Sequence, residues 1–260
     1  MPQQLWDRLQ ALAALHGSEM RITTSWGMTE TAPAATTAHF ALSRSDSIGV
    51  PLPGVELKLV RREGKQELFV RGPNVTTGFY KRPDLDRETF DTEGFLGTGD
   101  AVRLVDPADP GEGLLFDGRI AEDFKLASGT FVSVGTLRTK LISMSHGVIQ
   151  DAVICGHGGD FVSALVWVHP DYAHQIADDG TPDDGLHKDL AAGLNRLADL
   201  GGGATQRVER LLILTDPARL DAGEITDKGY INQRAVREKR ADLVAELTGV
   251  APSARTVTRS

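Results

Sequence analysis

The hydrophobic and polar positions follow helical spacing in some segments and strand spacing in others. Leucines recur three or four residues apart near the amino end, at Leu5, Leu9 and Leu12. They predict a first helix that ends near Gly17. Apolar and charged residues alternate in VELKLVRR and QELFVRG, which flank a charged turn at 63–65. This alternation is typical of a half-buried β-hairpin.

The same patterns continue through the rest of the chain. A second hairpin is expected between Ala101 and Gly118, with its turn at 106–111. Strand-like and helical segments then alternate: a short helix at 137–144, strands at 148–155 and 161–170, an amphipathic helix at 186–197, a strand at 208–216 and a last helix at 231–247. This order predicts a mixed α+β fold. The ten residues after Val250 are expected to form a disordered tail.

Composition narrows the class of protein. The chain has 260 residues and a net charge of −8, from 28 Lys and Arg against 36 Asp and Glu. This balance argues against nucleic acid or an anionic membrane as the main partner. The longest apolar runs fall well short of the ~20 residues of a membrane span. Cys155 is the single cysteine, which excludes an internal disulfide framework. We therefore expect a soluble, cytoplasmic protein.

Four segments carry candidate chemistry. They are TTSWGMTETAP (Thr23–Pro33), the stretch from GVPLPGVELKLV to GFYKRP (Gly49–Pro83), the stretch from GFLGTGDAVRLVD to FKLASGT (Gly94–Thr130), and GEITDKGYINQRAV (Gly223–Val236). In this order and spacing they resemble the adenylate-forming (AMP-binding) superfamily of acyl-CoA synthetases, luciferases and peptide-synthetase adenylation domains. GRIAEDFKLASGTFVSVG and ITDKGYINQRAV are most similar to feruloyl-CoA synthetases.

The resemblance implies a domain organisation. Residues 1–118 would be the carboxy-terminal part of the large AMP-binding domain, with a β-barrel-like subdomain, and 119–250 the small, mobile α+β domain, followed by the tail 251–260. Ala121 stands at the family's hinge, where Asp or Lys is common. The glycine-, serine- and threonine-rich phosphate loop of the family does not precede Thr23. We therefore expect the carboxy-terminal half of a longer synthetase, with little activity unless an amino-terminal half is supplied.

The resemblance also implies a reaction. Enzymes of this family activate a carboxylic acid with ATP, giving an acyl-AMP and pyrophosphate, and then exchange AMP for a thiol. This chain would be an acid–thiol ligase that uses ATP, Mg²⁺ and CoA. Its small-molecule acid would be a hydroxycinnamate such as ferulate, as in phenylpropanoid degradation. Such chemistry depends on positioning and on neutralising phosphate charge.

Residues of WGMTE would contact the nucleotide. Trp26 offers a flat face on which adenine could stack, and the resemblance includes Gly27 beside it. Thr29 has a hydroxyl suited to a phosphate oxygen, and Glu30 is a hard oxygen ligand for Mg²⁺. Both would belong to the catalytic site. The structural alternatives are a core or interface tryptophan and a turn or helix cap.

Two further residues would bind the nucleotide: Asp100 of the TGD segment and Arg119 of the DGR segment. Asp100 matches the family aspartate that accepts hydrogen bonds from both ribose hydroxyls, a task suited to two carboxylate oxygens. Arg119 matches the arginine on the ribose and phosphate side. The alternatives are a turn aspartate after Gly99 and a surface arginine that opens a strand.

The remaining site residues lie in the carboxy-terminal part. Lys228 matches the catalytic lysine that bridges the substrate carboxylate and the α-phosphate, although Asp227 stands where the family usually has glycine. Lys125 stands where many members carry a lysine near the nucleotide. Gly129, or Ser128 if the register is displaced by one, falls near the glycine that lets the pantetheine arm of CoA pass.

Other functions remain open. The chain could be a non-catalytic remnant that binds a nucleotide or a partner chain, or a synthetase for another aromatic or fatty acid. Luciferase-type oxidation shares these motifs. A peptide-synthetase domain is disfavoured because nothing after Leu247 resembles a carrier domain. The seven histidines lack the tight spacing of metal ligands, so no histidine-based metal site is expected.

Overall fold

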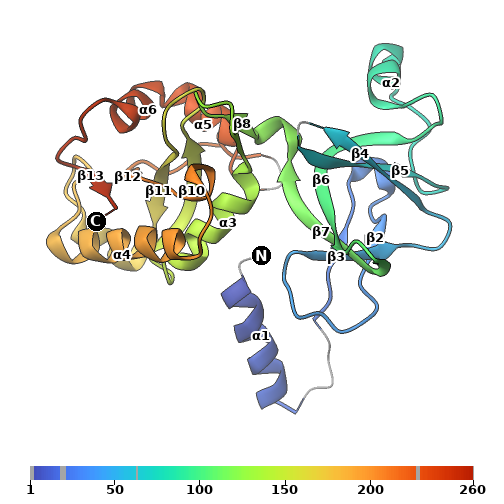
Figure 1. Ribbon diagram of the computed structural model, residues 1–260, viewed down its shortest axis with the longest axis horizontal. Coiled ribbons are helices and arrows are strands. Elements are labelled where there is room, and N and C mark those ends of the chain that lie inside the picture. The colour runs from blue at the N-terminus through green and yellow to red at the C-terminus, as the bar shows by residue number, and fades with distance from the viewer. Residues whose placement is uncertain (1–2, 18–21, 63, 227–228, 260) are drawn as a thin grey trace. The chain divides into compact units, whose positions relative to one another are not determined.

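The chain divides into two compact units, Met1–Ala121 and Glu122–Ser260 (Figure 1). The computed structural model describes residues 3–17, 22–62, 64–226 and 229–259. Both units combine helices with sheets, which confirms the mixed α+β class. The division follows Ala121, the residue at which the family resemblance implies a hinge. The expected boundary after residue 118 falls one residue before the end of the last strand of the first unit.

The first unit is built around a seven-stranded antiparallel sheet in the order β1-β2-β3-β7-β6-β5-β4. The strands are β1 (Ser25–Trp26), β2 (Thr36–Thr37), β3 (Ser47–Pro51), β4 (Glu56–Arg62), β5 (Lys65–Arg71), β6 (Leu96–Asp106) and β7 (Asp109–Arg119). The helices are α1 (Gln3–Leu15), the 3₁₀ turn η1 (Thr29–Thr31) and α2 (Pro83–Thr89).

The local predictions for this unit are largely confirmed. Helix α1 ends before Gly17, whose φ of 62° favours glycine. Strands β4 and β5 pair in continuous register from Glu56↔Arg71 to Arg62↔Lys65. Strands β6 and β7 form the second hairpin, and both are longer than expected. Among the described residues the sheet is open, with β1 and β4 at its edges, so it is not a closed barrel.

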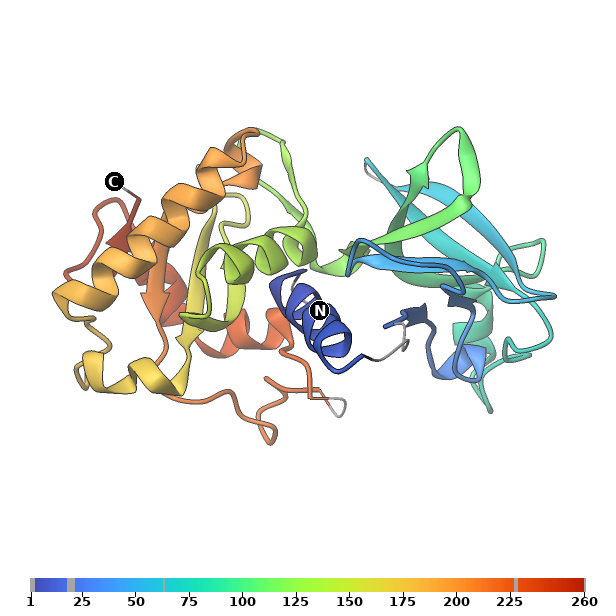
Figure 2. The same cartoon turned by 90° about the horizontal axis from the view of Figure 1, so that it is seen from below.

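The second unit is a sheet between two helical layers (Figures 1 and 2). Its main sheet has the order β10-β11-β12-β13, and β8 and β9 form a separate pair. The strands are β8 (Phe124–Lys125), β9 (Phe131–Val132), β10 (Ile149–Cys155), β11 (Ser163–Val168), β12 (Arg210–Ile213) and β13 (Thr256–Thr258). The helices are α3 (Val134–Met144), α4 (Asp184–Asp199), α5 (Gln233–Lys239) and α6 (Ala241–Thr248), with 3₁₀ turns η2 (Ile120–Glu122), η3 (Pro170–Gln175) and η4 (Ala204–Gln206).

Alternation along the strands explains the two layers. In β10, Ala152 and Ile154 face a core shared with α3 and α4, whereas Val153 and Cys155 face a second core shared with α5 and α6. Successive strand residues point to opposite faces of a sheet. The leucines of α4 are buried on one side, as the amphipathic pattern predicts. The central strands are therefore apolar on both faces.

Two predictions for this unit are wrong. The expected single helix at 231–247 is two helices, because the backbone at Arg240 leaves the helical region and its side chain turns inward. The tail is not disordered as far as it is described. Strand β13 pairs with β12, and Val257 is fully buried in the core. Burial of Val257 and the ladder hydrogen bonds order these residues.

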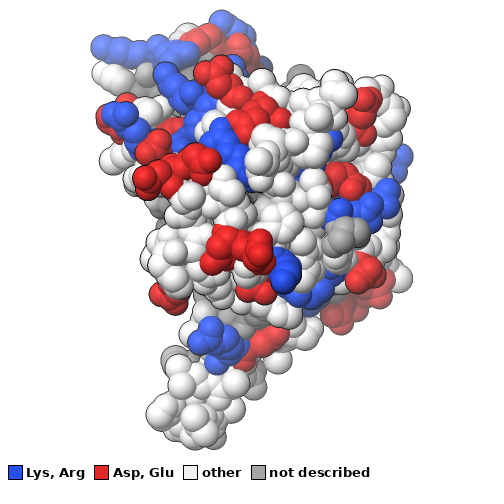
Figure 3. All heavy atoms as spheres, turned by 90° about the vertical axis from the view of Figure 1, so that its left-hand side faces the viewer, with Lys and Arg blue, Asp and Glu red and all other residues white. Residues whose placement is uncertain are grey.

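The surface carries charged side chains of both signs, as the composition of the chain predicts. On the face drawn in Figure 3, basic and acidic side chains interleave over the surface. Among the helices that the structure describes, none is both long and apolar enough to cross a bilayer.

Candidate nucleotide-binding site

Three of the predicted residues meet in the first unit. The indole Nε1 of Trp26 donates a hydrogen bond to Asp100 Oδ2 over 2.9 Å. Asp100 and Arg119 are register partners on β6 and β7, and Arg119 Nε lies 3.6 Å from Asp100 Oδ1. The Asp100 side chain is 16% exposed and that of Arg119 is 66% exposed. A nearly buried carboxylate therefore lies beneath a guanidinium that reaches into solvent.

A bulge in the sheet presents Asp100. Opposite β5, the pairing of β6 shifts between Gly97 and Ala101, and Gly99 adopts a φ of 69°. Bulges of this kind re-aim a side chain and favour glycine at the left-handed position. The glycine of the TGD segment is thus explained by backbone geometry, and it turns Asp100 toward Trp26.

The electrostatics of Asp100 are unusual for a surface-facing aspartate. Burial raises its pKa above the ordinary value of 3.8, and the charge of Glu67 adds to the rise. The Trp26 N–H and the charge of Arg119 oppose this rise without cancelling it. The ionised form is therefore under-compensated in the described structure, as is common at ligand-binding sites.

The WGMTE segment forms a tight turn beside this cluster. Thr29 and Glu30 lie in η1, and the buried Thr31 closes the turn because its Oγ1 accepts from the Met28 N–H over 2.9 Å. The capping task thus falls to Thr31. The side chain of Thr29 is exposed and that of Glu30 is half-buried.

A neighbouring loop fixes this turn. Asn74 donates to the carbonyl oxygens of Thr31 and Ala34 over 3.0 and 2.8 Å, and the Thr76 N–H donates to the Glu30 carbonyl. Sequence reasoning missed Asn74 and Thr31. Their only signal was the presence of small polar residues inside otherwise unremarkable loops.

The positions of Trp26 and Gly27 add a structural role to the predicted one. Trp26 is 8% exposed and belongs to the core of the unit, so most of its ring faces protein. A Cβ at Gly27 would lie 1.9 Å from the Pro33 carbonyl oxygen, so close backbone packing alone requires glycine here. Adenine stacking on Trp26 and a nucleotide contact at Gly27 stay predictions.

The chemistry of Glu30 is compatible with Mg²⁺. Mg²⁺ that is held chiefly by substrate phosphates and water needs only one or two protein carboxylates, and a half-buried glutamate beside an exposed threonine can supply one. No group of three His, Cys, Asp or Glu in the described part of the chain is arranged to enclose a metal ion without such a substrate.

The second unit carries the other predicted residues. Lys125 is exposed on β8, with its Nζ 6.0 Å from the centre of the Phe131 ring. Gly129 lies in the turn between β8 and β9 with a φ of 78°, and the described part of the chain leaves open space where a Cβ would be. This openness fits a segment that a ligand approaches closely. Lys228 and Asp227 lie outside the described residues.

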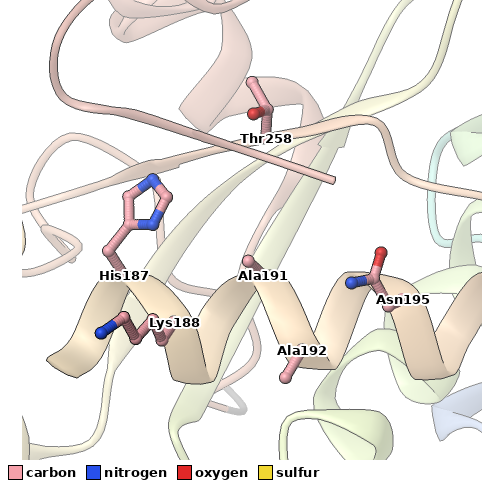
Figure 4. Close-up of a pocket in the computed structure, with 6 residues that line it drawn as sticks. All are labelled: His187, Lys188, Ala191, Ala192, Asn195 and Thr258. Atoms are coloured by element: carbon pink, nitrogen blue, oxygen red, sulfur yellow. The ribbon is translucent and has the colours of Figure 1, made fainter. Parts of the chain in front are cut away.

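A shallow depression of about 290 Å³ also lies in the second unit (Figure 4). One side is the α4 surface around His187 and Asn195, and the other is Thr258 of β13. None of the predicted site residues lines it, and we assign it no role in the reaction.

Comparison with known proteins places these features in context. Residues 1–80 match the family model described as AMP-binding enzyme. The chain is 26% identical over 235 residues to a long-chain-fatty-acid–CoA ligase of Mycobacterium bovis, covering 86% of this chain and 38% of that protein. It is 25% identical over 236 residues to a chloroplastic long-chain-fatty-acid–[acyl-carrier-protein] ligase of Arabidopsis thaliana, covering 85% and 32%. The chain thus spans well under two thirds of these relatives.

Solved structures share the fold. The adenylation domain of a carboxylate reductase from Mycobacterium chelonae superposes with a TM-score of 0.71 at 23% identity, over 90% of this chain and 36% of that one. An anthranilate CoA ligase in complex with anthranoyl-AMP gives 0.67 at 23% identity, over 95% and 43%. Over its first 80 residues the chain therefore matches the AMP-binding enzymes, with acyl-CoA ligases among its homologues and the fold of adenylate-forming enzymes.

Proposed function

We propose that this chain takes part in ATP-dependent formation of an acyl-AMP and in transfer of the acyl group to a thiol. The observation that carries the proposal is the convergence of Trp26, Asp100 and Arg119, which come from separate segments. The match of residues 1–80 to AMP-binding enzymes supports it. In this proposal Asp100 binds the ribose of the nucleotide.

The geometry of Asp100 suits a ribose. An ionised carboxylate offers about four acceptor positions on its two oxygens. The Trp26 N–H uses one of them, and Arg119 neutralises charge at 3.6 Å without a close hydrogen bond. Acceptor positions therefore remain for two vicinal hydroxyls. The exposed guanidinium of Arg119 is free to turn toward a phosphate oxygen, for which its planar donor set is suited.

The other proposed roles follow the chemistry of each side chain. The hydroxyl of Thr29 would contact a phosphate, and Glu30 would ligate Mg²⁺, which neutralises phosphate charge when it is bound. Lys228 would bridge the acid and the α-phosphate. In the second unit Lys125 would lie near the nucleotide, and the open turn at Gly129 would let the pantetheine arm of CoA pass.

The acid and the acceptor thiol are further parts of the proposal. The resemblance of GRIAEDFKLASGTFVSVG and ITDKGYINQRAV to feruloyl-CoA synthetases favours ferulate as the acid and CoA as the acceptor. The relatives named above act on long-chain fatty acids, with CoA or an acyl carrier protein, which gives the alternatives to test. The single, buried cysteine is compatible with a reducing cytoplasm.

The test is AMP formation by the purified chain with ATP, Mg²⁺, CoA and ferulate. The same assay is run with palmitate in place of ferulate, and with the chain joined to the upstream part of a related ligase. We expect ferulate-dependent AMP from the joined protein, and its loss in the Lys228→Ala variant. Glu238→Ala, on the exposed surface of α5, is the matched control and should leave AMP formation unchanged.

Each outcome has a meaning. AMP formed with palmitate but not ferulate would overturn the hydroxycinnamate assignment and retain the ligase. AMP formed by the chain alone would overturn the expectation that an upstream part is needed. Binding of AMP without any turnover, in the chain and in the joined protein, would instead support the non-catalytic nucleotide-binding alternative.

A further inference from the structure

We propose that Glu67 is a positioning residue for Asp100: it holds the β6 bulge through the Gly99 N–H and so sets where the ribose-binding carboxylate lies. The inference rests on the proposed function for the nucleotide role of Asp100. The bulge itself, and its attachment to Glu67, are features of the fold that can be tested without a nucleotide.

The register of β5 and β6 defines the bulge. Glu67 pairs with Ala101, and Phe69 pairs with Gly97. Three residues of β6 at 98–100 therefore lie opposite the single residue Leu68. Asp100 is the last of the three, so any slip of the bulge displaces it relative to Trp26 and Arg119.

Two side chains hold the extra residues in place. Thr98 Oγ1 donates to the Leu68 carbonyl over 2.7 Å and accepts from the Asp100 N–H over 3.1 Å. Glu67 Oε1 accepts from the Gly99 N–H over 3.1 Å. Among the described residues, no atom beyond the chain neighbours of Gly99 lies within 4 Å of the position that a Cβ would take there. The hydrogen bonds of Thr98 and Glu67 fix the backbone of this bulge.

The carboxylate of Glu67 is itself fixed. Its second oxygen, Oε2, accepts from Arg62 Nε over 3.1 Å, and its side chain is 14% exposed. A carboxylate held at both oxygens and shielded from water makes a stronger acceptor for a backbone N–H than a mobile surface group. Glu67 thus links the β4–β5 hairpin to the bulge of β6 that carries Asp100.

Glu67 also contributes charge. The groups that face Asp100 in the described structure are the Trp26 indole from β1, Arg119 from β7 and Glu67 from β5. Burial is the main cause of the raised pKa of Asp100, and of these three groups Glu67 is the one whose charge adds to the rise. Replacing its carboxylate with an amide removes this charge but keeps an oxygen that can accept from the Gly99 N–H. The two contributions of Glu67 can therefore be separated.

The experiment uses the indole N–H signals of the full ¹⁵N-labelled chain. The chain has three tryptophans, so each signal can be assigned with single Trp→Phe variants. The Trp26 signal reports directly on Asp100 through the 2.9 Å hydrogen bond. The variants are Glu67→Ala, Glu67→Gln and the control Glu56→Gln, which removes an exposed β4 carboxylate paired with Arg71.

The expected results distinguish positioning from charge. At pH 8, Glu67→Ala should shift the Trp26 signal and speed hydrogen exchange at the Gly99 amide by about tenfold, whereas Glu67→Gln should keep both close to wild type. In an acid titration, Glu67→Gln should lower the midpoint of the Trp26 signal. Glu56→Gln should match wild type throughout. If both Glu67 variants behave like Glu56→Gln, the positioning role is wrong.

A second arm measures AMP binding by calorimetry at pH 8. Glu67→Ala should weaken AMP binding by about tenfold, and Glu67→Gln should restore it to near the wild-type value. Wild-type chain that does not bind AMP would overturn the proposed nucleotide site and with it the ribose role, even if the Trp26 signals respond as expected. Wild-type binding with unchanged affinity in Glu67→Ala would overturn only the role of Glu67.

Discussion

The ion pair between Glu224 and Arg240 allows the sharpest prediction about the second unit. Arg240 Nε donates to Glu224 Oε1 over 2.8 Å and Nη2 donates to Oε2 over 2.9 Å, while the Arg219 N–H donates to the same Oε2 over 2.9 Å. The side chain of Arg240 is only 11% exposed and that of Glu224 only 4% exposed. Glu224 precedes Lys228 by four residues, so the pair anchors the chain just before the proposed catalytic lysine.

The perturbation is Glu224→Ala. Removing one partner of a buried ion pair costs about 3–5 kcal/mol, because the other charge stays buried without compensation. Arg240 also donates to the carbonyl oxygens of Asp216 and Pro217 over 3.2 and 3.0 Å, which compensates it in part. We therefore expect a loss of about 3 kcal/mol in the free energy of unfolding of this unit, at the lower end of that range.

The assay follows the Trp167 indole signal across a urea series, because Trp167 lies in the second unit and its ring is 5.3 Å from the Arg240 guanidinium. With a urea slope of about 2 kcal/mol/M, the unfolding midpoint should fall by about 1.5 M. The pair with Arg240 lowers the pKa of Glu224 from its ordinary 4.5. The stabilisation is therefore full above pH 4.5 and is lost as pH falls through the lowered pKa.

The control is Glu238→Ala, because Glu238 forms an exposed pair with Arg234 on α5 over 2.7 Å. It removes a glutamate side chain from the same unit and should leave the midpoint unchanged. An equal effect of the two substitutions, or an unchanged midpoint in Glu224→Ala, would refute the reasoning that burial gives this pair its weight.

Three further predictions concern separate features. Asp100→Asn should weaken AMP binding by about tenfold and, in calorimetry from pH 8 to pH 4, should abolish the acid loss of affinity that the raised pKa of Asp100 predicts for wild type. Gly27→Ala should cost about 1–3 kcal/mol of stability, seen as a lower melting temperature, because its Cβ would meet the Pro33 carbonyl. Val257→Asp should lower the stability of the second unit by about 3 kcal/mol or more in urea unfolding, since Val257 is fully buried opposite Leu211.

Local patterns predicted the elements whose partners are close in sequence. The β4–β5 hairpin follows from strict alternation and a short charged turn, and its strands pair as expected. Helix α4 follows from leucines at helical spacing and is buried on that face. In both cases the information needed lies within about 20 residues, so that tertiary contacts refine the element without changing it.

Contacts between residues far apart in the sequence explain the two predictions that were wrong, the single helix at 231–247 and the disordered tail. In the sequence, Arg240 is one more charged residue within a segment rich in Arg, Lys and Glu that predicts a single helix. Its buried partner Glu224 lies 16 residues upstream. The short segment around Val257 has too few apolar residues to predict a strand, yet β12 supplies a partner edge about 45 residues away. Neither contact leaves a periodic signal in the sequence.

In the candidate site, too, some residues could be predicted from the sequence and others depend on contacts that the sequence does not reveal. Trp26, Asp100 and Arg119 could be named because their motifs resemble a family, and the structure brings them together. Glu67 could not, because a glutamate in an alternating strand normally indicates a solvated face. Its role depends on a bulge in the neighbouring strand, and the glycine of TGD gives the only hint of one.

The pKa values of two mostly buried carboxylates, Glu224 and Asp100, shift in opposite directions, and the balance between burial and hydrogen-bond donors explains the contrast. Glu224 has three donated hydrogen bonds, two from the guanidinium that neutralises it, and its pKa falls. Asp100 is also mostly buried, and this burial raises its pKa, because in the described part of the chain its carboxylate has one side-chain N–H donor within hydrogen-bond distance and an arginine at 3.6 Å. Ionised Asp100 thus lowers the stability of the folded chain as pH rises above 3.8. In the function proposed above, the hydroxyl groups of a bound ribose would supply further donors to the Asp100 carboxylate.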